Sequence, residues 1–214
     1  MALTSWEDIK AWRQSTRKEL LARRLALNPR GRRGLGRSAY AHLLRALDDR
    51  FDVIGIYWPI RSEIDIRALA KAHLASGGRV ALPVIVQKAA PLEFWRWQPG
   101  MKMDRGVWDI PVPALREPVQ PDVLIAPLVG FDRCGFRLGY GGGYFDRTLA
   151  AASPRPYCIG IGYSETQLQT IHPQPHDIRM DAIVTDREIV THSPLQRPYR
   201  SPACLADTFN PRRS

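Results

Sequence analysis

The chain has 214 residues, of which 44% are hydrophobic and 24% charged, and its formal net charge is +10. This length suits one domain with a substantial core, and no apolar run approaches the ~20 residues that a membrane-spanning helix needs. Three widely spaced cysteines indicate neither a disulfide framework nor a zinc site, and the first residues lack the pattern of a secretory signal, so we expect a cytoplasmic protein.

The surplus of basic residues leaves two kinds of anionic partner open. Clustered Lys and Arg neutralise the phosphates of nucleic acids. A large share of the 31 basic residues lies before Phe51, however, and others lie near the C-terminus, outside any recognisable nucleic-acid module. A polyanionic small molecule would favour the same positive surface, so net charge alone does not separate the two.

The N-terminal part of the chain is predicted to hold two helices. The first covers residues 6–27 and ends at Asn28-Pro29 and the turns at Gly31 and Gly34, and the second covers residues 37–47. Arg13 and Arg17 are four residues apart and share one face of the first helix. Such a pair is more often a solvated basic face than a ligand contact.

An apolar strand at residues 51–58 is followed by a turn and by a helix at residues 65–76. The turn holds Trp58 and Glu63, which would lie at the carboxyl end of the strand, where open α/β sheets bind ligands. An isolated Glu before a helix is more often a partner of the helix dipole.

The remaining elements complete an alternating pattern. Further strands are expected at residues 79–86, 92–97, 123–126, 157–163 and 182–185, with Pro83 indicating an edge or a bend. Residues 99–121 are read as a loop rich in Pro and Gly, in which Trp108 could either pack beneath the loop or stack on a flat ring. The pattern predicts an α/β fold, a three-layer α/β/α domain with a mainly parallel central sheet over residues 1–192. Residues 193–214, rich in Pro and Arg, are expected to be a disordered or loosely packed tail.

The segment 137–147 carries the clearest functional signal. Four of its glycines fall within five positions, and a helix is expected at residues 145–152 directly after them. Glycine lets a ligand approach the backbone, and successive N–H groups before a helix form an anion-binding concavity. Arg137 and Arg147 add forked donors for phosphate, and Asp146 adds a hard oxygen of the kind that Mg²⁺ prefers. We therefore predict a phosphate site rather than a glycine-rich hairpin without a ligand, although not a Walker loop, because no Gly-Lys-Ser/Thr follows.

Residues 126–132 and 135–147 closely resemble the signature of the 5-formyltetrahydrofolate cyclo-ligases, also called methenyltetrahydrofolate synthetases, and weaker correspondences run from about Arg13 to Thr185. The resemblance implies an ATP site formed by Arg13, Arg17, Arg137, Leu138, Gly139, Tyr140, Gly141, Gly142, Gly143, Tyr144 and Phe145. It implies a folate site formed by Trp58, Glu63, Tyr140, Gly141, Gly142, Gly143 and Tyr144. It also implies that Asp146 and Asp181 hold Mg²⁺.

Two departures from the family pattern stand out. The family opens its first helix with a Lys-x-x-x-Arg pair that contacts ATP, whereas here Arg13 replaces the lysine. Lys10 is a candidate substitute, but its spacing to Arg17 differs from that of the family pair. The family's Gly-Ile-x-Glu-Pro turn is replaced by residues 106–111, so no site residue is assigned in that loop.

The resemblance implies ATP-dependent cyclisation of 5-formyltetrahydrofolate to 5,10-methenyltetrahydrofolate, with release of ADP and phosphate, through phosphorylation of the formyl oxygen. Phosphoryl transfer needs alignment and charge neutralisation more than a nucleophile, so we assign no catalytic residue. The expected partners are small molecules, ATP and a folate that carries one or more glutamates, and we expect a monomer. Two alternatives stay open: a nucleic-acid-binding protein, or an ATP- or sugar-phosphate-binding paralogue whose folate pocket has drifted, both on the same fold.

Overall fold

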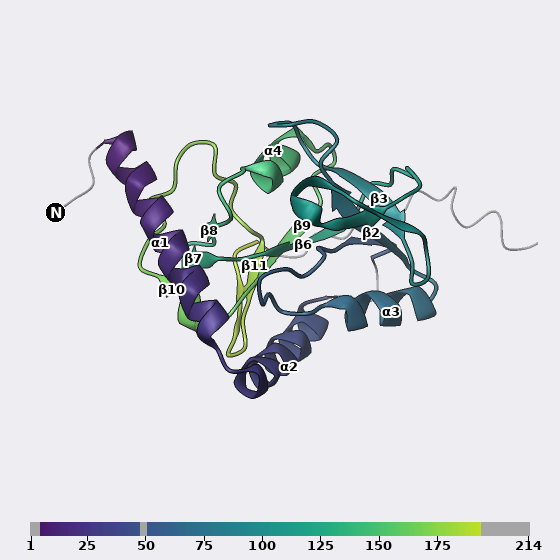
Figure 1. Ribbon diagram of the computed structural model, residues 1–214, viewed down its shortest axis with the longest axis horizontal. Helices are drawn as coiled ribbons and strands as arrows, with labels where there is room; N and C mark the ends of the chain where they lie inside the picture. The colour runs from purple at the N-terminus through teal and green to yellow at the C-terminus, as the bar shows by residue number, and fades with distance from the viewer. Residues whose placement is uncertain (1–4, 48–50, 194–214) are drawn as a thin grey trace, which may run out of the picture.

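A seven-stranded sheet in the order β12-β11-β9-β6-β1-β2-β3 forms the centre of the computed structural model, which describes residues 5–47 and 51–193 (Figure 1). The five inner strands are parallel, and β3 and β12 pair antiparallel at the two edges. Almost every residue of the inner strands is buried, as expected for a sheet covered on both faces. The strands are β1 (Val53–Gly55), β2 (Arg79–Val84), β3 (Glu93–Trp97), β6 (Val123–Pro127), β9 (Tyr157–Ile161), β11 (Ala182–Val184) and β12 (Ile189–Thr191).

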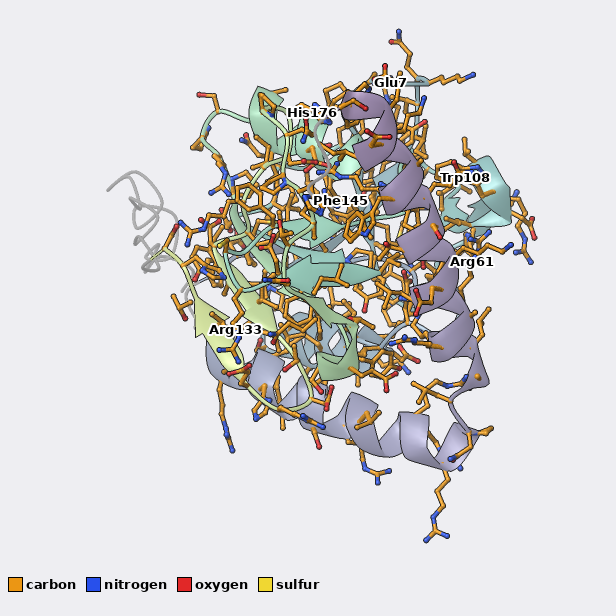
Figure 2. All side chains as sticks on the ribbon, turned by 90° about the vertical axis from the view of Figure 1, so that its left-hand side faces the viewer. Glu7, Arg61, Trp108, Arg133, Phe145 and His176 are labelled. Atoms are coloured by element: carbon orange, nitrogen blue, oxygen red, sulfur yellow. The ribbon has the colours of Figure 1, made fainter. Side chains whose placement is uncertain are left out.

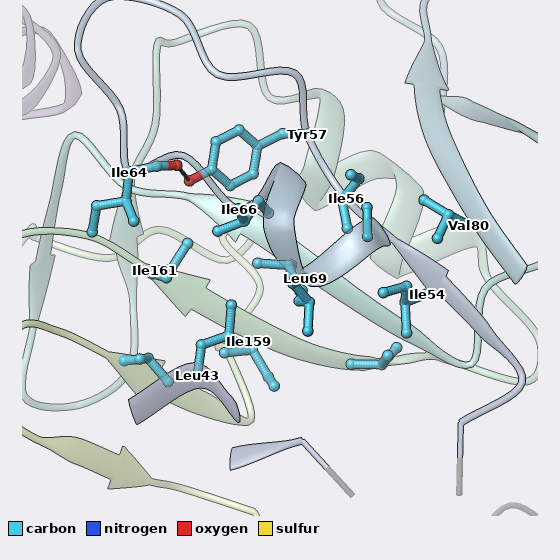
Figure 3. Close-up of a cluster of buried hydrophobic side chains, with 14 of the residues drawn as sticks. Leu43, Ile54, Ile56, Tyr57, Ile64, Ile66, Leu69, Val80, Ile159 and Ile161 are labelled. Carbon is cyan, nitrogen blue, oxygen red and sulfur yellow. Dashed lines mark hydrogen bonds between the residues drawn. The ribbon is translucent and has the colours of Figure 1, made fainter. Parts of the chain in front are cut away.

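Helices cover both faces of this sheet. In Figure 1, α2 (Pro29–Ala46) and α3 (Arg67–Ala75) lie below the sheet and α4 (Tyr144–Ala151) lies above it. On the α2 and α3 side, Leu43 and Leu69 pack among strand residues such as Ile54 and Ile159 (Figure 3). On the other side, Leu149 of α4 belongs to a second buried cluster. The predicted three-layer fold with a mainly parallel sheet is therefore confirmed.

The first helix, α1 (Trp6–Ala26), lies beside a small sheet rather than on the central one. This three-stranded sheet has the order β10-β7-β8, from β7 (Gly130–Asp132), β8 (Arg137–Leu138) and β10 (Gln167–Leu168). Leu20 of α1 packs with Leu138 and Ile171 in a third buried cluster. The helix begins where the Ser5 hydroxyl accepts from the N–H of Asp8 at 3.1 Å.

The second helix begins earlier than the sequence indicated. It starts at Pro29 rather than at residue 37, so the turns predicted at Gly31 and Gly34 are wrong. The carboxamide Oδ1 of Asn28 accepts from the N–H of Gly31 at 2.7 Å, which caps the helix. Proline suits the first helical position because its fixed φ is helical and its missing N–H would have no partner there.

The predicted 99–121 loop contains a hairpin. Strands β4 (Met103–Arg105) and β5 (Pro111–Pro113) pair antiparallel, and the 3₁₀ turn Val107–Asp109 lies between them. A second 3₁₀ turn, Ser164–Thr166, precedes β10.

Pro83 does not mark an edge strand, because β2 lies between β1 and β3. The carbonyl of Ala81 accepts from the N–H of Ile56 at 3.0 Å, so Ala81 faces β1. Pro83, two residues later, faces the same side, beyond the end of β1 at Gly55. Its missing N–H therefore interrupts no ladder.

Within the two described ranges, no helix combines the length and the apolar character needed to cross a membrane. The predicted tail begins at Ser193, whose N–H donates to the carbonyl of Asp181 at 3.1 Å. Residues 194–214 lie outside the described residues. The boundary between residues 1–192 and the tail stays a prediction.

Candidate active site

A cavity of about 410 Å³ opens at the carboxyl ends of three neighbouring strands of the central sheet. Trp58 follows β1, Ile85 follows β2, and Pro127 ends β6, and all three line the cavity. The helix α1, the segment 137–147 and the β4–β5 hairpin supply the other walls. This is the edge at which open α/β sheets bind ligands, and the volume lies within the range of ~300–1,000 Å³ that is usual for ligand pockets.

The segment 137–147, called the glycine loop below, joins β8 to α4 along one wall of the cavity. Gly141 and Gly143 have φ values of 95° and 64°, in the left-handed region that glycine tolerates best. Gly143 is also the N-cap of α4, and no side chain caps this helix. The positive end of α4 therefore faces the cavity with its N-cap unoccupied by a side chain, and Asp146 in its first turn is paired with Arg137, an arrangement that suits a phosphate.

Two arginines of the glycine loop keep unused donors. Arg137 is 8% exposed and forms an ion pair of 3.0 Å with Asp146. Arg147 donates to the carbonyl of Gly142. The Nε atoms of both arginines are buried without a hydrogen-bond partner in the structure. Buried donors are normally paired, so these two fit an anionic ligand that supplies the missing acceptors.

Arg17 of α1 lies against the glycine loop, as its predicted role requires. Its Nε donates to the carbonyl of Gly139 at 2.8 Å. Burial lowers the pKa of Arg17, and the charge of Arg13 lowers it further, while Asp177 opposes the shift. Since an arginine pKa starts far above neutrality, we expect Arg17 to stay cationic and to retain donors for an anion.

Arg13 lines the same cavity, but its guanidinium is held by the protein. It is 5% exposed, and its Nε donates to the carbonyl of Ile171 at 3.0 Å. Its Nη2 donates to the carbonyl of His172 at 2.9 Å and forms an ion pair of 2.5 Å with Asp177. Arg13 therefore fastens α1 to residues 171–177. Lys10, one turn earlier on the cavity side of α1, has no ion pair with any residue in the described ranges.

Glu63 and Trp58 both line the cavity, on the side that follows β1. Glu63 accepts from the N–H of Ile60 at 2.9 Å and from the hydroxyl of Tyr140 at 2.7 Å. Burial raises the pKa of Glu63, while these two hydrogen bonds and the nearby charges of Arg24 and Arg61 oppose the rise. The Trp58 ring packs edge-on against Trp97 with 6.2 Å between centroids.

The β4–β5 hairpin adds an apolar wall that the sequence did not reveal. Val107, Trp108, Ile110 and Val112 all line the cavity. Trp108 is 65% exposed, and its ring lies 5.9 Å from that of Tyr144 in the glycine loop. In the view of Figure 2, Trp108 and His176 lie on opposite sides of α1. The aromatic residue was visible in the sequence, but nothing there distinguished a cavity wall from local packing.

Other cavity residues come from two segments that the chain folds together at the N-terminal end of α1. Trp6 packs edge-on against His176 with 5.9 Å between ring centroids, and Asp177 follows. Only the pairing of α1 with residues 171–177 brings them to the cavity.

The two predicted metal ligands have different surroundings. Asp146 lines the cavity, where its oxygens accept from Arg137 at 3.0 Å and from the N–H of Ile178 at 3.1 Å. Asp181 is 5% exposed and accepts from Arg155 at 2.8 Å and from the N–H of Cys158 at 2.7 Å. It does not line the cavity.

No group of three or more His, Cys, Asp or Glu in the described part of the chain could hold a metal ion by itself. Mg²⁺ bound with a nucleotide needs only one or two protein carboxylates, because phosphates and waters complete its shell. Asp146 fits that requirement. Asp181 has the surroundings of a structural carboxylate.

The fold and the cavity define an α/β protein with an anion-suited glycine loop facing apolar walls at the carboxyl edge of a mainly parallel sheet. More specifically, the chain belongs to the 5-formyltetrahydrofolate cyclo-ligase family, whose profile matches residues 9–186. The resemblance noted in the sequence is thereby confirmed.

Individual relatives agree with this placement. Over 139 residues the chain is 34% identical to the 5-formyltetrahydrofolate cyclo-ligase of Mycolicibacterium smegmatis. The matched segment covers 61% of this chain and 72% of that protein. The chain is 30% identical over 174 residues to the Haemophilus influenzae protein of the same name, covering 78% and 93%. Among solved structures, the 5,10-methenyltetrahydrofolate synthetase of Aquifex aeolicus matches with a TM-score of 0.72 and 26% identity, covering 84% of this chain and 92% of that one.

Proposed function

We propose that this protein is an ATP-dependent 5-formyltetrahydrofolate cyclo-ligase that forms 5,10-methenyltetrahydrofolate, ADP and phosphate. One observation carries the proposal: two features line the same cavity. One is the glycine loop, whose arginines keep buried unpaired donors, and the other is an apolar wall that holds the Glu63 carboxylate. The glycine loop suits a triphosphate. The apolar wall with its carboxylate suits a flat ring whose edge carries several hydrogen-bond donors. Membership of the family supports the same pairing of ligands.

In this proposal the glycine loop and α1 bind the triphosphate. The N–H groups at the start of α4, together with Arg17, Arg137 and Arg147, neutralise and align the γ-phosphoryl group. Lys10 joins them at the rim, because the donors of Arg13 are already engaged. Arg13 then acts by holding the wall formed by α1 and residues 171–177.

The folate occupies the apolar end, with Glu63 facing its donor-rich edge and Trp58 and Trp108 beside its ring. The formyl oxygen attacks the γ-phosphorus of ATP, so that the P–O bond to ADP breaks and the formyl carbon becomes electrophilic. N10 of the folate then attacks that carbon and loses its proton, and the former formyl oxygen leaves as part of phosphate. The protein supplies alignment and charge neutralisation, and no nucleophilic side chain is required.

Asp146 is the residue that would hold Mg²⁺ beside the phosphates. When bound, this ion would neutralise charge on the β- and γ-phosphates and keep them in one orientation. Asp181 is not assigned that role, because it does not line the cavity and its carboxylate accepts from Arg155 and from the backbone of Cys158.

A direct assay tests the function. The protein is mixed with ATP, Mg²⁺ and 5-formyltetrahydrofolate, and the ultraviolet absorbance of the methenyl product is followed. We expect product formation that requires ATP and releases one ADP per ring closed. Nucleotide binding without turnover would instead favour the drifted paralogue, and salt-dependent RNA binding without folate turnover would favour the nucleic-acid-binding alternative. The monomeric state stays a prediction.

A further inference from the structure

A tyrosine hydroxyl connects the two ends of the cavity. Tyr140 belongs to the glycine loop, and its hydroxyl donates to Oε1 of Glu63 at 2.7 Å. The same oxygen accepts from Nη2 of Arg24 on α1 at 2.6 Å. The phenol therefore lies between a cation and a carboxylate, donating its one proton and accepting at a lone pair.

Both ends of this chain of hydrogen bonds are anchored. Arg24 is 2% exposed and also donates to the carbonyl of Leu128 at 3.0 Å. At the other end, Oε2 of Glu63 accepts from the N–H of Ile60 at 2.9 Å. The carboxylate orientation thus depends on one backbone donor and on a hydroxyl whose own position is set by α1.

We propose that Tyr140 is a positioning residue for the folate, whose hydroxyl holds the Glu63 carboxylate in the orientation that receives the donor-rich edge of the ring. This inference rests on the proposed function, because it gives Tyr140 a role only if Glu63 faces the folate. The effect belongs to one oxygen atom of Tyr140, and the affected ligand is the folate rather than the nucleotide.

The charged and titratable groups around Glu63 give this role a measurable signature. They are Tyr140 on the glycine loop, Arg24 on α1, Arg61 in the same turn as Glu63, and Tyr57 after β1. Burial raises the pKa of Glu63, and the hydrogen bond from Tyr140 opposes that rise. Removing the hydroxyl should therefore raise the Glu63 pKa further, and the ionised fraction of Glu63 at a given pH should fall.

The test variant is Tyr140→Phe, which keeps the ring and its packing and removes only the hydroxyl. We expect the KM for 5-formyltetrahydrofolate to rise about tenfold, since a lost hydrogen bond to a buried charge is a large effect, while the KM for ATP stays within about twofold. The acid limb of kcat/KM for the folate should move to higher pH. Tyr157→Phe is the matched control, because it removes a hydroxyl that donates to Ser193 at 3.2 Å outside the cavity.

A double-mutant cycle separates positioning from packing. If Tyr140 acts through the carboxylate, adding Tyr140→Phe to Glu63→Ala, which removes the acceptor of the Tyr140 hydroxyl, should raise the folate KM much less than Tyr140→Phe does alone. Folate affinity, measured by calorimetry without ATP, should follow the same pattern and needs no turnover.

Three results would overturn the inference. These are an unchanged folate KM and acid limb in Tyr140→Phe, an equal rise in both KM values, and additive effects in the double mutant. A wild-type protein that binds folate but forms no methenyl product would overturn the proposed function instead, and the binding measurements would still decide the role of Tyr140.

Discussion

Arginines around the cavity differ in how many of their donors the protein already uses. Every nitrogen of the Arg13 guanidinium donates to a carbonyl or to Asp177. Arg137 and Arg147 each keep a buried Nε without a partner. A buried donor without an acceptor costs ~1–3 kcal/mol, which an arriving phosphate oxygen would recover. Arg13 therefore fastens the wall of the cavity, whereas the arginines of the glycine loop are the ones that we propose bind the ligand.

Asp146→Asn should lower turnover about a hundredfold while the protein stays folded. The change removes the anionic oxygen proposed for Mg²⁺, and metal stabilisation of phosphoryl charge is worth several kcal/mol. Initial rates over a Mg²⁺ titration, with a thermal melt, measure both quantities. Asp181→Asn is the control, since that residue lies outside the cavity. It should lower the melting temperature and leave the Mg²⁺ midpoint unchanged. An unaltered Mg²⁺ dependence in Asp146→Asn would remove Asp146 from the metal site.

Glu63→Ala should raise the KM for 5-formyltetrahydrofolate by about tenfold or more. A site built around a hydrogen-bonding carboxylate loses ~1.4 kcal/mol or more when that partner is removed, which is a factor of ten. The KM for ATP should change little, because the nucleotide is assigned to the glycine loop and α1. Steady-state kinetics of the variant, with each substrate titrated in turn, measure both KM values. A fall in ATP affinity alone would assign Glu63 to the nucleotide end.

Elements that are specified by a local residue pattern were easier to predict from the sequence than elements that depend on distant contacts. The inner strands are apolar runs and α1 follows helical spacing, so both were found near their observed bounds. The glycine loop was found because its residue types are unusual in themselves. Strands β7, β8 and β10, with two or three residues each, were missed because so short a run has no periodicity. The β4–β5 hairpin and the contacts of Arg13 depend on distant partners, which no local pattern encodes.

At the start of α2, Asn28→Ala should cost ~1 kcal/mol of unfolding free energy. The Asn28 side chain caps the helix by accepting from the N–H of Gly31 at 2.7 Å, and loss of an N-cap typically costs about that much. For a chain of this size we expect the melting temperature to fall by about 2–4 °C. Asn28→Ser, which can restore the cap, should recover most of the loss. Equal melting of the Ala and Ser variants would mean that the cap contributes nothing.

Within the glycine loop, Gly142→Val should abolish ATP binding and affect folate binding less. A Cβ at Gly142 would lie 2.8 Å from the Tyr144 ring, so the loop must shift where the phosphates approach. Calorimetric titration with each ligand measures the difference. Gly36→Ala is the control, because a Cβ there would meet nothing within 4 Å. Equal loss of both ligands, with a lowered melting temperature, would make Gly142 a structural glycine.

For the whole molecule, a chain ending at Ser193 should keep nearly full turnover. Among the residues that the structure describes, those that line the cavity all lie between Trp6 and Asp177. Keeping Ser193 preserves the hydrogen bond from the Tyr157 hydroxyl at 3.2 Å. Steady-state kinetics of the truncated and full-length proteins provide the comparison. A large rise in the KM for ATP on truncation would show that arginines beyond Ser193 reach the nucleotide.

The fastening of α1 by Arg13 has a consequence for how the protein is made. Its acceptors Ile171, His172 and Asp177 follow it by 158 to 164 residues. At ~5–20 residues per second, α1 leaves the ribosome on the order of ten seconds before these partners are synthesised. One wall of the cavity is therefore among the last parts of the chain to be fixed. Nascent chains that stop short of residue 177 should not capture ligand, so ligand binding reports that synthesis has passed residue 177.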